Sequence, residues 1–81
     1  MKKIKSIPQA NITGEFIRRA RVKAGLTQQE LSAKLELVPI YICRGSVSRI
    51  ENGTRAVTDI ELDAIAKVLN VSLDELFGKT E

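Results

Sequence analysis

Hydrophobic side chains recur at intervals of three and four residues along most of the chain, the spacing that places them on one face of an α-helix. The first such stretch predicts a helix from about Thr13 to Ala24, ended by Gly25. Its apolar face is expected to consist of Phe16, Ile17, Ala20 and Ala24.

Two short helical patterns follow within residues 27–53. Thr27 and Glu30 have the spacing of a capping box, in which each side chain bonds the other residue's backbone N–H. This predicts a helix through Glu36, with Leu31 and Leu35 facing inward. The second pattern, Arg44 to Asn52, turns Val47 and Ile50 inward, and Gly53 supplies the left-handed residue that ends it.

The connection between these two helices runs from Leu37 to Cys43 and contains Pro39. Ile40 and Ile42 alternate around Tyr41, which predicts a short extended segment with one side packed on the core. Tyr41 is then expected to point outward, with solvent as the default surrounding and phosphate or a partner as the alternatives.

The last third of the chain predicts two more helices. Thr58 with Glu61 forms a second capping box and opens a helix that ends at Asn70, and Ser72 with Glu75 forms a third. The inward positions are Leu62, Ile65, Ala66 and Leu69 in the longer helix, and Leu73, Leu76 and Phe77 in the shorter one. Leu73 and Phe77 fit either a core or a dimer patch. The predicted fold is therefore all-α, with five helices.

Composition limits the architecture to one small domain. The chain has 81 residues, of which 43% are hydrophobic. We assign residues 12–78 to the domain and residues 1–11 to a flexible basic arm, because Pro8 interrupts any helix there. Lys2, Lys3 and Lys5 could follow a phosphate backbone, or the segment could be a frayed terminus. No apolar run suggests a membrane span or a secretory leader, and a single cysteine fits a reducing cytosol, so we expect a cytoplasmic protein.

Charge is distributed unevenly. Residues 1–25 hold seven basic residues and one acidic residue, residues 26–58 hold four and three, and residues 59–81 hold two and six. This asymmetry suggests one face for an anionic polymer and another turned away from it. Ordinary solvated surface charge is the alternative.

The residue inventory argues against an enzyme and against a metal or cofactor site. The chain has no histidine and one cysteine, which excludes a thiolate-rich zinc site, and it has no glycine-rich phosphate loop. Asp59, Glu61 and Asp63 cluster, but acidic residues are expected at a helix N-terminus. Cys43 fits a small buried hydrophobe better than a redox switch.

Two separated blocks, Gly25–Leu31 (GLTQQEL) and Val47–Gly53 (VSRIENG), resemble the helix-turn-helix of the Xre family, the phage-repressor (Cro and lambda-repressor) type of DNA-binding domain. The resemblance continues through VTDIELDAIAKVLNVSLDELF and covers residues 12–78. One departure is the connection of seven residues, 37–43, where a turn of about three to four residues is usual. This lengthened turn affects the angle between the two helices.

The resemblance implies a five-helix repressor-like fold and a sequence-specific DNA-binding transcriptional regulator, expected to be a repressor, that places the helix around 44–52 in the major groove. It also implies a homodimer on double-stranded DNA, with no small-molecule ligand. A protein-interaction or antitoxin-type module built on the same fold is the alternative.

The resemblance also assigns roles to individual residues. Arg21 and Glu51 are expected to form a partly buried pair. The expected base-reading residues are Arg44, Gly45, Ser48 and Arg49, although Gly45 has no side chain with which to read. The expected phosphate contacts are Thr27, Gln28, Ser46, Asn52, Thr54 and Arg55.

Overall fold

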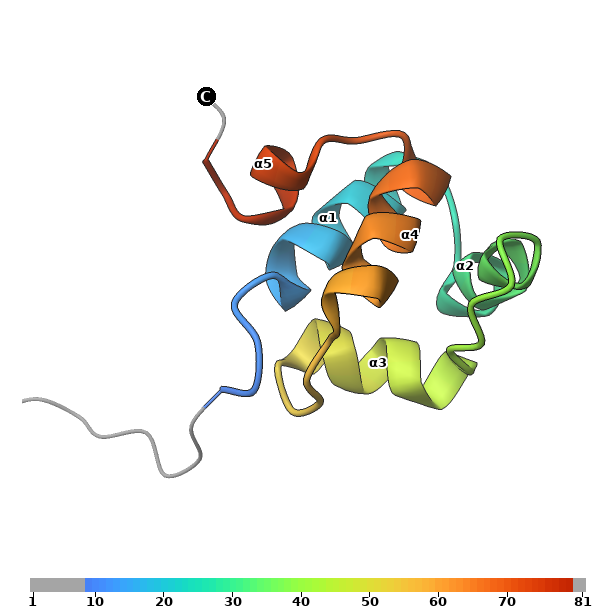
Figure 1. Cartoon of the computed structure of the whole chain (residues 1–81), viewed down its shortest axis with the longest axis horizontal. Helices are drawn as coiled ribbons and strands as arrows, with labels where there is room; N and C mark the ends of the chain where they lie inside the picture. The colour runs from blue at the N-terminus through green and yellow to red at the C-terminus, as the bar shows by residue number, and fades with distance from the viewer. Residues whose placement is uncertain (1–8, 80–81) are drawn as a thin grey trace, which may run out of the picture.

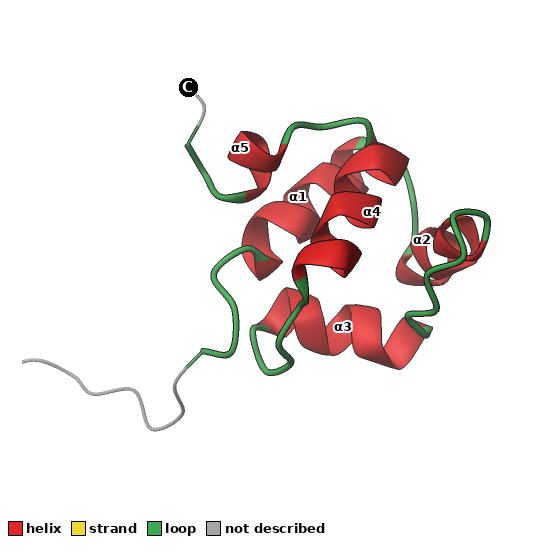
Figure 2. Ribbon diagram, viewed as in Figure 1, coloured by secondary structure: helices red, strands yellow, loops and turns green. Residues whose placement is uncertain are grey.

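The computed structural model describes residues 9–79 and shows five helices joined by loops, with no strand in that range (Figures 1 and 2). The helices are α1 (Gly14–Lys23), α2 (Gln28–Glu36), α3 (Arg44–Asn52), α4 (Asp59–Leu69) and α5 (Leu73–Leu76). In Figure 1, α3 runs along the lower edge, α1 and α4 lie above it, and α2 lies to the right. The predicted all-α, five-helix fold is confirmed.

Three of the helices begin at the predicted capping boxes. Thr27 Oγ1 accepts from the Glu30 N–H at 3.0 Å, and Thr58 Oγ1 accepts from the Glu61 N–H at 3.1 Å. Ser72 caps α5 in the same way. At the other ends, Gly53 adopts the left-handed conformation after α3, as predicted, and Asn70, predicted to end α4, is also left-handed. Local sequence therefore sets most of the helix boundaries.

The core gathers one apolar face from each helix. Its buried members are Ile17, Leu31, Leu35, Ile42, Val47, Ile50, Leu62, Ala64, Ile65, Ala66, Leu69 and Leu76. One predicted core residue is wrong: Ala24 is exposed. Helix α1 ends at Lys23, so Ala24 is its C-cap at the edge of a surface hollow rather than part of the packed face.

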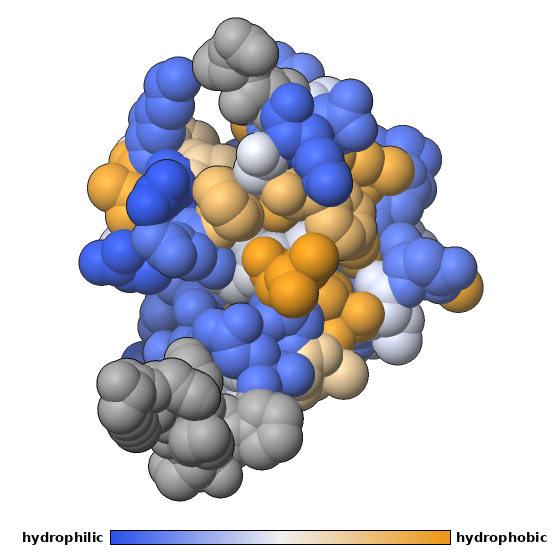
Figure 3. Space-filling model, turned by 90° about the vertical axis from the view of Figure 1, so that its left-hand side faces the viewer, coloured by the Kyte–Doolittle hydropathy of each residue, from blue (hydrophilic) through white to orange (hydrophobic). Residues whose placement is uncertain are grey.

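Helix α5 is anchored by one fully buried side chain, Leu76. Leu73 and Phe77, for which the sequence left two roles open, are 44% and 38% exposed. Phe77 lines a surface hollow together with Ile12 and Val57. Figure 3 shows apolar side chains gathered in the middle of this face, the left-hand side of Figure 1. This face therefore presents apolar surface to solvent.

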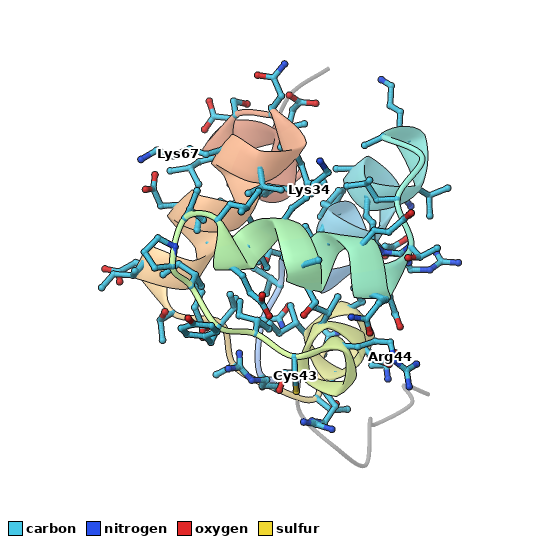
Figure 4. All side chains as sticks on the ribbon, turned by 90° about the vertical axis from the view of Figure 1, so that its right-hand side faces the viewer. Lys34, Cys43, Arg44 and Lys67 are labelled. Carbon is cyan, nitrogen blue, oxygen red and sulfur yellow. The ribbon has the colours of Figure 1, made fainter. Side chains whose placement is uncertain are left out.

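The connection between α2 and α3 has the predicted length, from Leu37 to Cys43. Ile42 is buried and Tyr41 is exposed, as their alternation predicted. The Ser32 hydroxyl donates to the Ile42 carbonyl at 2.7 Å and so ties the loop to α2. The expectation that Cys43 is buried is wrong: it is exposed, because as the N-cap of α3 it lies at the end of the loop and points away from the core (Figure 4).

The predicted boundary between arm and domain lies too far along the chain. Residues 1–8, with Lys2, Lys3 and Lys5, lie outside the described residues. Residues 9–11, however, pack on the end of α3. The Ala10 N–H donates to the Gly53 carbonyl at 2.8 Å, and Asn11 makes further bonds described below. These three residues therefore belong to the domain.

Candidate nucleic-acid interface

Helix α3 turns its apolar residues inward and most of its polar residues outward. Val47 and Ile50 are buried against the other helices. On the outward side, Arg44, Arg49 and Asn52 are exposed, whereas Gly45, Ser46 and Ser48 are partly exposed. Figure 4 shows the Arg44 side chain projecting away from the helical bundle. The predicted base-reading residues thus share the solvent side of one helix.

On the inward side, Glu51 is a buried carboxylate paired with Arg21. The Arg21 Nε donates to Glu51 Oε2 at 2.7 Å, and Nη2 donates to Oε1 at 2.9 Å. The two side chains are only 11% and 1% exposed. The hydrogen bond to Glu51 raises the pKa of Arg21, against the opposing effect of burial. The structure therefore contains the pair that the sequence led us to expect.

The same carboxylate reaches the first residue of α2. Gln28 Nε2 donates to Glu51 Oε1 at 3.0 Å. Arg21 in turn donates through Nη1 to the Leu26 carbonyl at 2.8 Å, just before α2. Glu51 thereby links α1, α2 and α3. Gln28, expected to contact phosphate, is held beside α3. In the first turn of α2 the Glu30 N–H bonds Thr27 Oγ1, whereas the N–H groups of Gln28 and Gln29 lie too early in the helix for an internal partner.

Asn11 ties the start of α1 to the end of α3. Its Oδ1 accepts from the N–H groups of Thr13 and Gly14, at 3.1 and 2.7 Å. Its Nδ2 donates to the carbonyls of Ile50 and Arg55, at 3.0 and 2.8 Å. Sequence reasoning missed this residue. The available signal was weak, because an asparagine before a helix suggests an N-cap but not its long-range bonds.

Gly14 brings the two backbones together at the same place. A Cβ atom on Gly14 would lie 2.2 Å from the Ile50 carbonyl oxygen and 3.1 Å from that of Glu51. Any larger residue would therefore push α1 and α3 apart. The end of α3 is fixed both by hydrogen bonds and by close backbone contact.

Arg49 lies back along the first turn of α3. Its Nη2 donates to the Ser46 hydroxyl at 3.1 Å. A Cβ atom built on Gly45 would lie 3.5 Å from Arg49 Nη1, so the guanidinium group also borders the space that Gly45 leaves open. Two of the residues assigned to DNA contact, Ser46 and Arg49, therefore contact each other.

Arg55 has an internal partner. Its guanidinium group makes two bonds of 3.1 Å to the carboxylate of Glu61, and Nη1 also donates to the Ala56 carbonyl at 2.9 Å. The bond from Arg55 is the main cause that lowers the pKa of Glu61. Thr54, another expected phosphate contact, donates its hydroxyl to the Arg49 carbonyl at 3.3 Å. The loop after α3 thus uses two expected phosphate ligands for its own structure.

The sequence pattern of the helix-turn-helix family matches residues 17–76. The chain belongs to the Xre type of this family. It is also similar to a solved structure, the restriction-modification controller protein C.AhdI from Aeromonas hydrophila. The two chains share 28% identity with a TM-score of 0.70, over 80% of this chain and 87% of C.AhdI. A search of curated protein sequences finds no match.

Family and fold together make this Xre-type protein a DNA-binding transcription regulator. Residues 9–79 contain no group of three or more histidine, cysteine or acidic residues able to hold a metal ion. The helices in that range are also too short or too polar to cross a membrane.

Basic side chains of the Xre-type domain occur on opposite sides of the molecule. In Figure 4, Arg44 lies at the N-terminus of α3, whereas Lys34 and Lys67 lie on the other side of α2. Lys67 is also paired with Asp63 at 3.0 Å.

Beside Arg44, the Ser46 hydroxyl and nearby backbone N–H groups lower the pKa of the exposed Cys43 thiol. The N-terminal end of α3 thus favours negative charge.

Proposed function

We propose that this protein binds DNA sequence-specifically by inserting α3 into the major groove, and that it represses transcription by occupying its site. The supporting observation is the composition of the outward side of α3. It carries two exposed arginines among small polar residues, while the one acidic residue of the helix, Glu51, is buried and paired. A groove lined by base-edge acceptors and flanked by phosphates is the complement of such a surface.

We assign base reading chiefly to Arg44 and Arg49, because a guanidinium group can donate two parallel bonds to guanine O6 and N7. Ser48 is the remaining side chain available for base edges on that side. The N–H groups of Gln28 and Gln29, which follow Thr27 and are not used by the capping box, suit a phosphate, which sets orientation without reading sequence. Asn52 is exposed and available for a second backbone contact.

The sequence suggested a phosphate contact for Arg55, and the structure changes that expectation. Its guanidinium group is bonded to Glu61, so a phosphate would have to share it or compete with a carboxylate that is 16% exposed. We therefore propose a weaker contribution from Arg55 to DNA affinity than from Arg44 or Arg49.

We further propose that the protein binds as a homodimer through the apolar face that carries Leu73 and Phe77. Phe77 and the exposed Ile12 line one hollow, and Leu73 leaves further apolar surface exposed. In Figure 1 this face forms the left side, while α3 runs along the lower edge. If two copies pair about a vertical two-fold axis on that side, both α3 helices lie along the lower edge of the dimer. Both helices could then reach two half-sites on one face of a duplex.

Selection of bound duplexes from a random pool tests this proposal. We expect an enriched, palindromic site whose half-sites are about one helical turn, roughly 34–36 Å, apart. Light scattering of the protein alone and with the selected duplex measures the oligomeric state. A pool without sequence enrichment would refute sequence-specific binding, and a monomer both free and on the duplex would refute the dimer.

A further inference from the structure

We propose that Gly45 and Ser46 together form a seat that positions the Arg49 guanidinium group, so that Arg49 reads the base pair facing the vacant position 45. This inference rests on the proposed function. It changes the role of Ser46 from a phosphate contact to a positioning residue. It also makes Gly45 a specificity determinant through the space that it leaves.

The geometry follows from the direction of side chains on a helix. Each Cα–Cβ bond tilts toward the helix N-terminus, so a long side chain covers the turn that precedes it. For Arg49, the preceding turn presents the residues three and four positions earlier, Ser46 and Gly45. The seat is therefore where the backbone itself directs the arginine.

Gly45 provides the free space. It lies near the middle of the outward side of α3, opposite the buried Val47 and Ile50. A Cβ atom there would be in ordinary contact with Arg49, 3.5 Å from Nη1 and 4.0 Å from Nη2. An alanine would therefore fit, whereas a longer side chain would occupy the volume that the guanidinium group now uses.

Ser46 provides the fixed point. Its hydroxyl accepts from Arg49 Nη2 at 3.1 Å, and it lies 3.5 Å from Cys43 Sγ on its other side. Holding a long side chain in one place before binding lowers the entropy lost on binding. The bond holds the guanidinium group near the N-terminus of α3, where the helix dipole disfavours a cation. A partner rich in acceptors would therefore stabilise the group at this position.

A first experiment removes and restores the hydroxyl. Base preference is measured on the selected duplex and its single-base-pair variants. Arg49→Ala identifies the base pair that Arg49 reads, because discrimination at that base pair should fall by about 5-fold to 150-fold. Ser46→Ala should lower discrimination at that same base pair by about two- to tenfold. Ser46→Thr, which keeps a hydroxyl, should restore it. Equal weakening of every duplex by Ser46→Ala would show a phosphate contact and overturn the proposal.

A second experiment fills the space at position 45. Gly45→Ala should leave discrimination at the Arg49 base pair unchanged, and Gly45→Leu should abolish it. Leucine also favours the helix, so folding should not suffer, which thermal unfolding checks. Gly45→Leu is then combined with Arg49→Ala. If leucine acts by displacing the arginine, the double variant should show the same loss of discrimination at that base pair as Arg49→Ala alone.

The results separate this inference from the proposed function. If the wild-type protein enriches no sequence, sequence-specific binding itself fails. If it enriches a site but Ser46→Ala and Gly45→Leu leave preference at the Arg49 base pair intact, the seat fails while the proposed function stands. An additional loss of discrimination from Gly45→Leu in the Arg49→Ala background would also overturn the seat.

Discussion

The two ends of α3 are built in opposite ways. At the C-terminal end, Asn11 binds the Ile50 carbonyl, Gly14 packs against the same carbonyl, and Glu51 joins Arg21 in a buried pair. At the N-terminal end, a seven-residue loop leads into a helix without a side-chain cap hydrogen bond. There the polar groups face solvent instead of other helices.

The C-terminal end of α3 fixes how the helix is oriented, and the N-terminal end leaves side chains free for the proposed contacts with DNA. Repressor-type helices contact base edges mainly through their N-terminal residues, so that end must keep its side chains available. The orientation of the whole helix can then be set at the other end, where bonds to α1 and α2 bury the polar groups. The comparison predicts that substitutions at the C-terminal end reduce stability and that substitutions at the N-terminal end chiefly change binding.

The largest loss of stability is expected from Glu51→Ala. It would leave Arg21 buried without its partner and remove the bond to Gln28, so the free energy of unfolding should fall by about 3–5 kcal/mol. Chemical denaturation measures this change. Glu15→Ala is the matched control, because Glu15 and its partner Arg19 are both 63% exposed and such pairs contribute little. Equal midpoints for Glu51→Ala and the wild type would contradict the account.

Asn11→Ala should have the next largest effect, about 2–3 kcal/mol, because it removes the oxygen that accepts from the first N–H group of α1 and leaves the Arg55 carbonyl without its donor. The Ile50 carbonyl also loses a bond but keeps the Gly53 N–H as a donor. Asn11→Asp sharpens the comparison, since it keeps the cap acceptor but loses the donor to Ile50 and Arg55. It should therefore remain destabilised relative to the wild type. Recovery of full stability by aspartate would show that the link from Asn11 to the end of α3 carries no energy. Thermal unfolding of the three proteins distinguishes these results.

Arg55→Ala should reduce stability by up to about 1 kcal/mol at neutral pH, because the Arg55–Glu61 pair is partly exposed. Arg55 holds the folded-state pKa of Glu61 below its ordinary value of 4.5. The stabilisation is thus present above that value and disappears as the pH falls through the lower, folded-state pKa. Unfolding curves of wild type and variant should converge in acid. A stability difference that persisted in acid strong enough to protonate Glu61 in the folded protein would contradict this linkage.

The smallest effect, and one of opposite sign, is expected at the other end of α3. Cys43 occupies an N-cap position with extended backbone angles but makes no side-chain cap bond. Serine is a preferred N-cap residue, so Cys43→Ser should raise the free energy of unfolding by about 0.5–1 kcal/mol. A Cys43→Ser variant that is less stable than the wild type, by denaturant titration, would mean that the thiol already caps the helix.

The fold was predictable where the deciding interactions are local. The capping boxes at Thr27, Thr58 and Ser72 each depend on residues three positions apart, and the spacing of Val47 and Ile50 is enough to orient α3. The pair between Arg21 and Glu51 was expected from family resemblance, not from spacing.

The parts that escaped prediction depend on tertiary contacts. Asn11 bonds residues 39 and 44 positions away, which no local pattern encodes. Arg55 was expected to contact phosphate, and Glu61 was expected to cap α4. The Glu61 carboxylate makes both the cap bond and the bond to Arg55. Ala24 and Cys43 were expected to be buried from residue type and helical spacing, neither of which shows where the core ends.

Affinity for selected and scrambled duplexes at two salt concentrations tests most directly whether the outward side of α3 reads base sequence. Arg44→Ala and Arg49→Ala should each weaken binding to the selected duplex by about 1–3 kcal/mol more than binding to the scrambled one. Lys34→Ala, an exposed cation away from α3, is the control and should leave this difference unchanged. If both arginine variants weakened the two duplexes equally, α3 would not be reading bases and the claim would be wrong.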